Sequence, residues 1–260
     1  MFFRLSSLEV FLIVSLVVVG TTVLGLVVGR ALRDRSEHLH QALGVLQGAL
    51  LGLVALVLAF GLALAVGRYE ARRAAVVDEA NAIGTTYLRA QMLAEPVRTR
   101  SLERLRRYTD ASIRLSASVP SSEAAESAIA EGQRLQRELW SLAGESVAAS
   151  PVETAPRLYV ETLNEMIDMQ TTRVAALGNR VPGAVLALEV IGAAVALGLL
   201  ALYLSLLGRG VTPVLLAAGL VTLLLLVTFD LDRPTRGLIK VPDTPLVSLR
   251  ASMELPPAVP

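Results

Sequence analysis

The stretch from Gly67 to Leu93, GRYEARRAAVVDEANAIGTTYLRAQML, connects a very apolar segment of the chain to a charged one. Its first residues place several arginines beside Tyr69, and this mixture of cations with an amphipathic ring is typical of a membrane–water interface. Residues 43–93 contain neither a proline nor a pair of adjacent glycines, so we expect one unbroken helix through Arg72. The stretch therefore predicts a helix that leaves a membrane and continues into a polar domain.

Beyond the interface, this helix is predicted to have two different faces. At about 3.6 residues per turn, side chains three and four positions apart share a face. The apolar face holds Val76, Ala80, Ile83 and Tyr87, and the opposite face holds a polar stripe of Asp78, Asn81, Thr85 and Arg89. We expect the apolar face to pack in a domain core and the polar stripe to contact water or a partner.

The composition points to a membrane protein, because 53% of the residues are apolar and only 18% are charged. The apolar residues gather in four blocks, at 8–28, 43–66, 183–207 and 211–229. At about 1.5 Å per residue, each block is long enough to cross a hydrocarbon core of roughly 30 Å. A cleaved signal peptide is the alternative for the first block, but the run is too long for one and no small-residue cleavage site follows it.

We therefore predict an all-α polytopic membrane protein with four transmembrane helices and a cytosolic helical bundle inserted between the second and third. The predicted domains are a first transmembrane hairpin at 1–66, a cytosolic helical domain at 67–182, a second transmembrane hairpin at 183–229 and a cytosolic C-terminal tail at 230–260. In the helical domain, Trp140 lies beside an apolar stripe and is expected in the core. The proline-containing tail is expected to be extended, and disordered beyond Met253.

The second block carries small residues at three- and four-residue steps. This small-residue seam consists of Gly48, Gly52, Ala55, Ala59 and Ala63. Such a seam allows another helix to approach closely, as in membrane helix pairs of the small-xxx-small kind. It also suits the wall of a narrow ion conduit, and the sequence leaves both interpretations open.

A few charged residues lie within or beside the predicted spans. Glu189 lies inside the third block, where an acid is costly and is therefore a functional candidate, unless it reaches the interface or meets an arginine. Asp230, Asp232 and Arg233 follow the fourth block, on the same side of the membrane as Arg72 and Arg73. We expect a charge network at this interface, in which one of the two arginines meets one of the two aspartates.

The distribution of cations predicts how the chain is oriented. Nine basic residues flank the membrane on the side of the helical domain and four flank it on the other side. The nine are Arg4, Arg68, Arg72, Arg73, Arg173, Arg180, Arg233, Arg236 and Lys240, and the four are Arg30, Arg33, Arg35 and Arg209. By the positive-inside rule, both termini and the helical domain are cytoplasmic.

Several classes of function are excluded by what the sequence lacks. There is no cysteine, no P-loop, no Gly-x-Ser-x-Gly and no His-Glu-x-x-His, and the two histidines lie together in one short loop. His38 and His40 are two residues apart and would point to different sides of a helix, so we predict no metal site, no cofactor and no enzyme activity. A net charge of +1 without a basic arm argues against nucleic acid as a partner.

Two separated motifs resemble the bestrophin-like family of bacterial membrane proteins. The first is RYEARR followed by DEANAIGTTYLRA, at the exit of the second span, and the second is DLDRPTRGLIKV with PLVSLRASM after it. The resemblance implies an inner-membrane protein of bacteria with the architecture of bestrophin channels, which are pentamers with four spans per subunit and a helical cytosolic part. No segment matches the acidic calcium clasp of those channels.

Two functions from different classes follow from these observations. The first is a homo-oligomeric ion channel or pore in the lipid bilayer, with the conduit around a symmetry axis, because four spans in one chain enclose too little space for a hydrated path. Inorganic ions would then be the transported species. The alternative is a membrane-anchored sensor or scaffold, whose helical domain binds a partner or ligand and whose spans only hold it in place.

Overall fold

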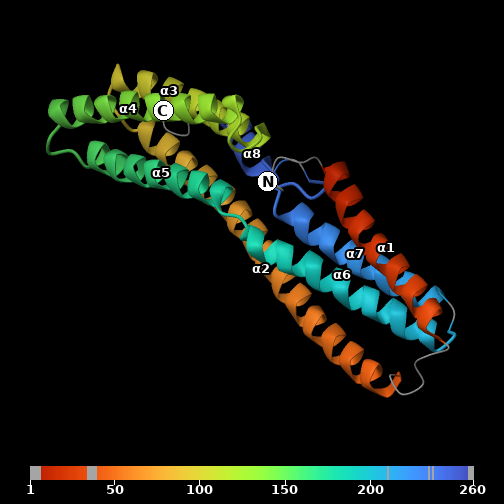
Figure 1. Ribbon diagram of the computed structural model, residues 1–260. Helices are drawn as coiled ribbons and strands as arrows, with labels where there is room; N and C mark the ends of the chain where they lie inside the picture. Colours follow the sequence, from red (N-terminus) through yellow and green to blue (C-terminus); the bar gives the residue numbers. More distant parts are fainter. Residues whose placement is uncertain (1–6, 34–39, 210, 234, 236, 257–260) are drawn as a thin grey trace. The chain divides into compact units, whose positions relative to one another are not determined.

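The chain folds entirely into helices over the residues that the computed structural model describes, which are 7–33, 40–209, 211–233, 235 and 237–256 (Figure 1). In chain order these are α1 (Ser7–Leu32), α2 (His40–Ala90), α3 (Val97–Ala117), α4 (Glu123–Ala149), α5 (Thr154–Gly178), α6 (Gly183–Leu206), α7 (Thr212–Leu231) and α8 (Thr244–Ser252). Within these residues, four helices are long and apolar enough to cross a membrane. An all-helical membrane protein with four candidate spans is thus confirmed.

The helices belong to two compact units, and α2 takes part in both. One unit contains residues 1–68 and 180–239, and therefore α1, the first part of α2, α6 and α7. The other contains residues 69–179 and 240–260, and therefore the rest of α2 together with α3, α4, α5 and α8. As the sequence predicts, α2 continues without interruption from 66 to 78, where it passes from one unit to the other.

In the first unit, α1 and α6 pack closely because glycines remove the side chains between them. A Cβ added to Gly25 would collide with the carbonyl oxygen of Gly198, and one added to Gly198 would lie 3.3 Å from the Thr21 carbonyl oxygen. The hydroxyl of Ser205 also donates a hydrogen bond of 3.0 Å to the Leu26 carbonyl. Close packing of small residues therefore holds α1 against α6. The sequence analysis did not predict this packing.

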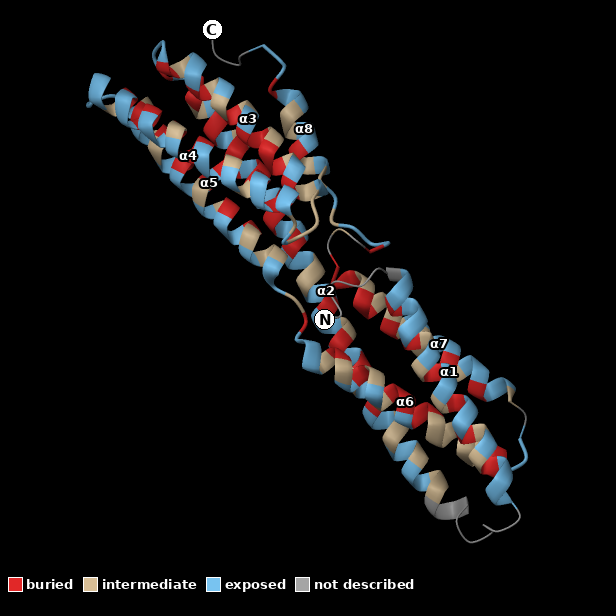
Figure 2. Cartoon of the chain, turned by 45° about the horizontal axis from the view of Figure 1, so that its top comes forward, coloured by how far each residue is buried: buried red, intermediate tan, exposed pale blue. Residues whose placement is uncertain are grey.

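The first part of α2 has one buried face, which contacts α6. Val54 and Leu58 are each 7% exposed and Ala65 is fully buried. A Cβ added to Gly192 of α6 would lie 3.3 Å from a methyl group of Val54. Figure 2 shows that the other faces of this part of α2 are mostly exposed or intermediate, so one helix face alone joins it to its own unit.

In the second unit, α2 contributes the predicted apolar face to a helical core. Val76, Ala80, Ile83 and Tyr87 are all buried, as their spacing predicts. They pack with residues of α3, α4 and α5 that include Leu105, Tyr108, Leu135, Leu139, Leu163 and Met166, all of them inaccessible to solvent. Ser122 caps α4, because its hydroxyl accepts a hydrogen bond of 3.2 Å from the Ala125 amide.

The C-terminal segment is not the extended tail that its prolines suggest. Residues Thr244–Ser252 form α8, which begins with Pro245 in its first turn, where a missing N–H costs nothing. Leu246 and Met253 are fully buried in the core of the second unit, and Arg250 pairs with Asp110 of α3 at 2.8 Å. Burial of these two side chains stabilises a helix too short to form alone. The expected disorder beyond Met253 concerns a segment of which only 254–256 lie within the described residues.

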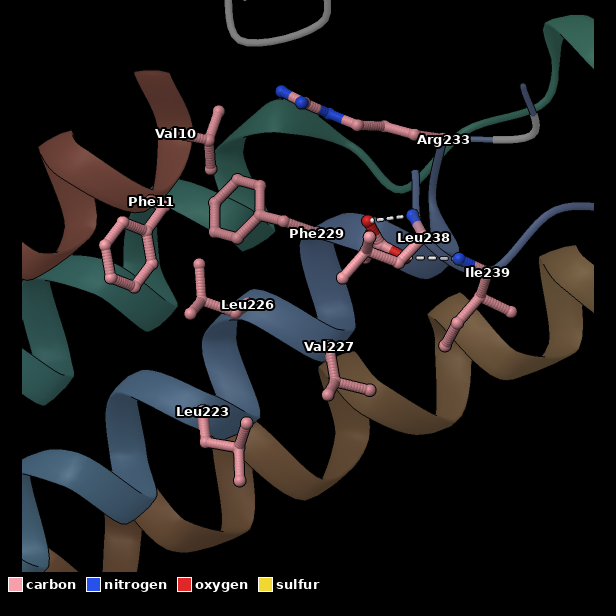
Figure 3. A pocket seen from close by; sticks show the side chains of 10 residues that line it. Val10, Phe11, Leu223, Leu226, Val227, Phe229, Arg233, Leu238 and Ile239 are labelled. Carbon is pink, nitrogen blue, oxygen red and sulfur yellow. Dashed lines mark hydrogen bonds between the residues drawn. The ribbon is translucent and has the colours of Figure 1, made fainter. Parts of the chain in front are cut away.

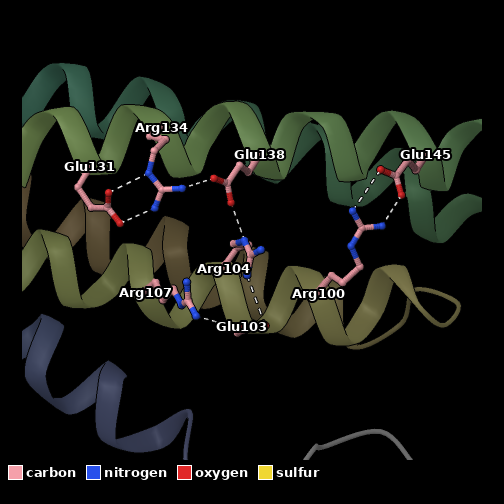
Figure 4. A network of polar contacts seen from close by, with 8 residues as sticks. All are labelled: Arg100, Glu103, Arg104, Arg107, Glu131, Arg134, Glu138 and Glu145. Carbon is pink, nitrogen blue, oxygen red and sulfur yellow. Dashed lines mark hydrogen bonds and ion pairs between the residues drawn. The ribbon is translucent and has the colours of Figure 1, made fainter.

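One further expectation for the helical domain is corrected by the structure, which also shows contacts that the sequence analysis did not predict. Trp140 was expected in the core but is 48% exposed, because it lies beside the buried stripe of α4 rather than in it. Two of the α3 arginines pair with acids of α4, as Figure 4 shows for Arg100 with Glu145 at 2.7 Å and Arg104 with Glu138 at 2.6 Å. These acids lie 34 and 45 residues away in the sequence, beyond the reach of helix-spacing rules.

Candidate functional site

The small-residue seam of α2 lies on a face that no other part of the described chain covers. All five of its residues, Gly48, Gly52, Ala55, Ala59 and Ala63, are exposed, whereas the buried face of the same helix is formed by Val54, Leu58, Gly61 and Ala65. A Cβ added to Gly48 or Gly52 meets no described atom within 4 Å. Packing of the seam against another span of the same chain, one of the two interpretations of the sequence, therefore has no support within the described residues.

A third face of α2 is also uncovered but carries large side chains. Leu53, Leu56, Phe60 and Leu64 lie there, with exposed fractions of 42% to 62%. Large aliphatic and aromatic side chains are the usual surface that a helix presents to lipid or to a neighbouring apolar helix. The first part of α2 therefore has three distinct faces, one packed on its own unit, one lined by small residues and one lined by large apolar residues.

Within the second unit, most of the polar stripe is exposed as well. Asp78, Asn81 and Thr85 are exposed, while Arg89 is half-buried because it contacts α5. The Arg89 guanidinium donates a hydrogen bond of 2.8 Å to the Leu158 carbonyl and lies 3.5 Å from a carboxylate oxygen of Glu161. Three members of the stripe are thus available to water or a partner, and the fourth is engaged in holding α2 against α5.

Glu189 lies buried in α6, facing a notch in α2. The side chain is fully inaccessible, and within the described residues neither of its carboxylate oxygens has a hydrogen-bond partner. The notch exists because residue 61 is glycine, and a Cβ at Gly61 would collide with Glu189 Oε1. Glu189 is therefore buried between α6 and α2 and has not turned toward the interface, and its functional role remains a prediction.

The second unit contains a buried ion pair that the sequence analysis missed. Glu79 of α2 forms a salt bridge with Arg173 of α5, and the two side chains are 0% and 2% exposed. Ser112 of α3 donates to Glu79 at 3.0 Å, Tyr108 donates to it at 3.3 Å, and Arg173 donates to Ser116 at 2.6 Å. Glu79 comes three residues after Val76 and four before Ile83, so its spacing places it on the apolar face of α2, and this was the one available signal of its burial.

The arginines at the junction of α2 have different surroundings. Arg72 is 2% exposed and donates to two carbonyls at the end of α5, at 2.8 Å to Asn179 and 3.3 Å to Ala176. They lie at the C-terminal end of α5, where the negative end of the helix dipole favours a cation. Arg73 is exposed and lies 3.6 Å from Glu70. Their predicted pairing with Asp230 or Asp232 remains a prediction.

The two acids at the end of α7 accept hydrogen bonds from backbone amides of other segments. Asp230 accepts hydrogen bonds of 2.8 Å from the backbone amides of Leu238 and Ile239 (Figure 3). Asp232 accepts one of 2.9 Å from the Val181 amide, at the entry to α6. Arg233 is 5% exposed and lines a pocket between α1 and α7. Each of these residues therefore has a defined place in the first unit.

No group of three or more His, Asp or Glu side chains lies close enough together in the described part of the chain to hold a metal ion. The surfaces that remain are helix faces: the small-residue seam, the polar stripe and the pocket beside Arg233. They belong to a polytopic helical membrane protein whose distinctive surface is an uncovered helix face.

The comparisons with known proteins place the chain in a family. A family model described as Bestrophin-like domain matches residues 11–246, nearly the whole chain. The chain therefore belongs to the bestrophin-like family, which confirms the resemblance carried by the two sequence motifs. A search of curated proteins found no match.

Solved structures with the same fold come from a bacterial bestrophin homolog of Klebsiella pneumoniae. A crystal structure of that homolog with a tyrosine-to-alanine mutation has 13% sequence identity and a TM-score of 0.69, covering 91% of this chain and 97% of the other. A second, obtained by Zn-SAD phasing, has 13% identity and a TM-score of 0.67, covering 91% and 95%. At this identity the likeness establishes the fold.

Proposed function

We propose that the protein is a homo-oligomeric ion channel of the bacterial inner membrane, in which the small-residue seam of α2 lines the conduit. The observation that carries the proposal is that this seam is left uncovered by its own chain, although small residues in a membrane helix usually serve close packing. In a symmetric oligomer the five uncovered positions would face the axis, and the large side chains of the third face would contact neighbouring subunits or lipid.

The family and the fold support the same proposal. The name of the family refers to bestrophins, and the structural relatives are bestrophin homologs that align over nine-tenths of this chain. Bestrophin channels are pentamers, and the resemblance favours that number of subunits here. The positive-inside rule favours a cytoplasmic location for the helical domain and both termini.

The polar stripe gives the proposed conduit a cytoplasmic continuation. Asp78, Asn81 and Thr85 are exposed in the second unit and offer oxygen and amide groups that replace part of an ion's hydration shell. We place them along the ion path below the membrane, with Asp78 as the group that attracts cations.

Thiol accessibility tests the proposal, because the chain contains no natural cysteine. Single substitutions Gly52→Cys, Ala59→Cys and Ala63→Cys are made in the full chain, and the purified protein in vesicles is treated with a charged, membrane-impermeant thiol reagent. A position that lines a conduit is wet, so we expect all three cysteines to react.

Matched controls come from the third face of the same helix. Leu53→Cys and Phe60→Cys lie at the same depth and are also uncovered in the single chain, but we expect them to face lipid or a neighbouring subunit and to stay unreactive. If the seam cysteines are inert, or if both faces react alike, the conduit is not along this seam. The membrane-anchored sensor or scaffold then becomes the better hypothesis.

A further inference from the structure

Glu189 is the one charged side chain inside the apolar stretches of the four candidate spans. No other Asp or Glu and no Lys, Arg or His occurs in these stretches, which are residues 10–28, 43–66, 183–206 and 212–229. Their only other titratable group is Tyr203, which lies fourteen residues further along α6, about 21 Å away along the helix axis. The spans therefore bring no second charge to Glu189 from α1, α2 or α7.

The charged groups nearest to Glu189 on the neighbouring helices stand at the ends of the spans. They are Glu9 on α1, Arg68 on α2 and Asp230 on α7. Arg68 is seven residues beyond Gly61, about 10 Å along the helix, and Asp230 already accepts two hydrogen bonds of 2.8 Å from backbone amides. Within the described residues, both oxygens of Glu189 are buried without a hydrogen-bond partner.

The notch at Gly61 suits a neutral carboxyl group and not a carboxylate. The Glu189 side chain is 0% exposed, and its Oε1 fills the place that a Cβ at residue 61 would take. A carboxylate that is buried without a cation or a hydrogen-bond donor costs several kcal/mol, and binding of a proton removes that charge. The notch therefore selects the protonated form of the acid.

The same carboxyl group lies within the contact that joins α2 to α6. Gly61 belongs to the buried face of α2, whereas the seam residues Ala59 and Ala63 lie two positions before and after it. Two positions correspond to about 200° around a helix, so the seam is on the side of α2 that faces away from Glu189. An ionised Glu189 requires water, and water reaches the notch when α2 moves away from α6, in the direction of the seam.

We propose that Glu189 is the site of an exchangeable proton, and that this proton holds α2 against α6. Loss of the proton separates the two helices and moves the small-residue seam toward the axis of the oligomer, so that alkaline pH narrows the conduit. This consequence for the conduit rests on the proposed function. The proton site and the contact between α2 and α6 do not, because both are formed within a single chain.

Infrared spectroscopy detects the proton directly. The full-length protein in vesicles is titrated between about pH 5 and pH 10, and the carbonyl stretch of protonated carboxyl groups is followed. Exposed carboxyl groups ionise near pH ~4, so a band that persists above that pH and is missing in Glu189→Gln belongs to this site. Glu189→Met is a second neutral variant, which needs no hydrogen bond in the notch. Absence of the band, or a band that stays unchanged up to pH ~10, would overturn the proposal.

Disulfide formation measures the helix contact. Val54→Cys is combined with Gly192→Cys, because a Cβ at residue 192 would lie 3.3 Å from a Val54 methyl group and the chain has no natural cysteine. Oxidation by a membrane-permeant reagent is compared at each pH between the protein with Glu189 and its Glu189→Gln and Glu189→Met variants. The pH dependence of the thiols themselves cancels in this comparison.

We expect equal rates of disulfide formation at the acidic end of the titration. Where the infrared band is lost, the rate should be several-fold lower with Glu189 than with either neutral variant, because a disulfide tolerates little change in the distance between two helices. Equal rates at every pH would show that the proton does not hold the helices together and would overturn the proposal. A pH-dependent rate in an oligomer that carries no current would support the proton site and contradict the channel.

Discussion

Gly25 and Gly61 show how much of the first unit depends on missing side chains. At Gly25 a Cβ would collide with a backbone carbonyl of α6, which cannot move without moving the helix, whereas at Gly61 it would meet the end of the Glu189 side chain. The sequence shows many glycines in the spans, but it does not show which of them face a neighbour. The seam on α2, which is the more regular pattern, is the one that its own chain leaves uncovered.

Substitution at Gly25 is predicted to be far more harmful than the same change one and a half turns earlier in α1. Gly25→Ala forces α1 away from α6 and should lower the free energy of unfolding by about 1–3 kcal/mol, the usual cost of overpacking. Gly20→Ala is the matched control, because a Cβ there meets no described atom within 4 Å. Thermal unfolding in the same detergent compares the two variants, and equal loss of stability would show that α1 and α6 do not pack as described.

Removing one partner of the Glu79–Arg173 pair is predicted to lower the free energy of unfolding. Replacing both partners with apolar residues is predicted to change it little. Arg173→Met leaves a buried carboxylate uncompensated and should cost about 3–5 kcal/mol, whereas Glu79→Leu together with Arg173→Met should restore most of that loss. The exposed pair of Arg73 and Glu70 is the control, for which removal of one partner changes stability by less than about 1 kcal/mol. Denaturant unfolding monitored by helical circular dichroism measures all of these variants. A double variant no more stable than Arg173→Met would contradict the account.

Helices with a long apolar pattern could be predicted from the sequence. Helices and ion pairs that depend on residues far away in the sequence could not. The four long apolar blocks and the unbroken stretch 43–93 predict α1, α2, α6 and α7 to within a few residues. The nine residues of α8 carry too little periodicity of their own, and their helix depends on the burial of Leu246 and Met253 by other helices. The acids opposite the α3 arginines were missed for the same reason, because α4 supplies them.

Packing between α3 and α5 should be visible in the titration of tyrosines. Burial raises the pKa of Tyr159 in α5 to about 12, and burial with the nearby Glu79 raises the pKa of Tyr108 in α3 well above its usual value. The folded state therefore keeps these protons longer than the unfolded state does. Its stability is unaffected below pH ~10, where an unfolded tyrosine begins to ionise, and falls as the pH rises from there through about 12.

Absorbance of tyrosinate between pH 9 and 13 tests this expectation. The chain has five tyrosines, of which Tyr108 and Tyr159 should ionise only together with the loss of helical circular dichroism. In Tyr159→Phe the late component should be smaller by one tyrosine. Ionisation of all five tyrosines near pH 10 with the helices intact would show that this core is accessible to water.

At the scale of the whole molecule, a channel requires an assembly of several chains. In the described residues of this 27.6 kDa chain, α1, α6 and α7 pack together, and α2 presents two uncovered faces. In a symmetric ring both uncovered faces of α2 would have a role. The face with large apolar side chains would contact neighbouring subunits, and the small-residue seam would surround the axis. The sequence predicts the seam and the stripe, and it does not contain the number of subunits, since that depends on surfaces that meet only in the assembly.

The most direct test of this account is the current carried by the Ala59→Cys protein in a planar bilayer. The purified oligomer is reconstituted, the current is recorded in simple salt, and a charged thiol reagent is added to both sides. We predict that the unmodified protein conducts, that the reagent blocks the Ala59→Cys current, and that it leaves the cysteine-free protein and Phe60→Cys unaffected. Absence of current at every voltage, or an Ala59→Cys current that the reagent does not change although the cysteine is fully modified, would contradict it.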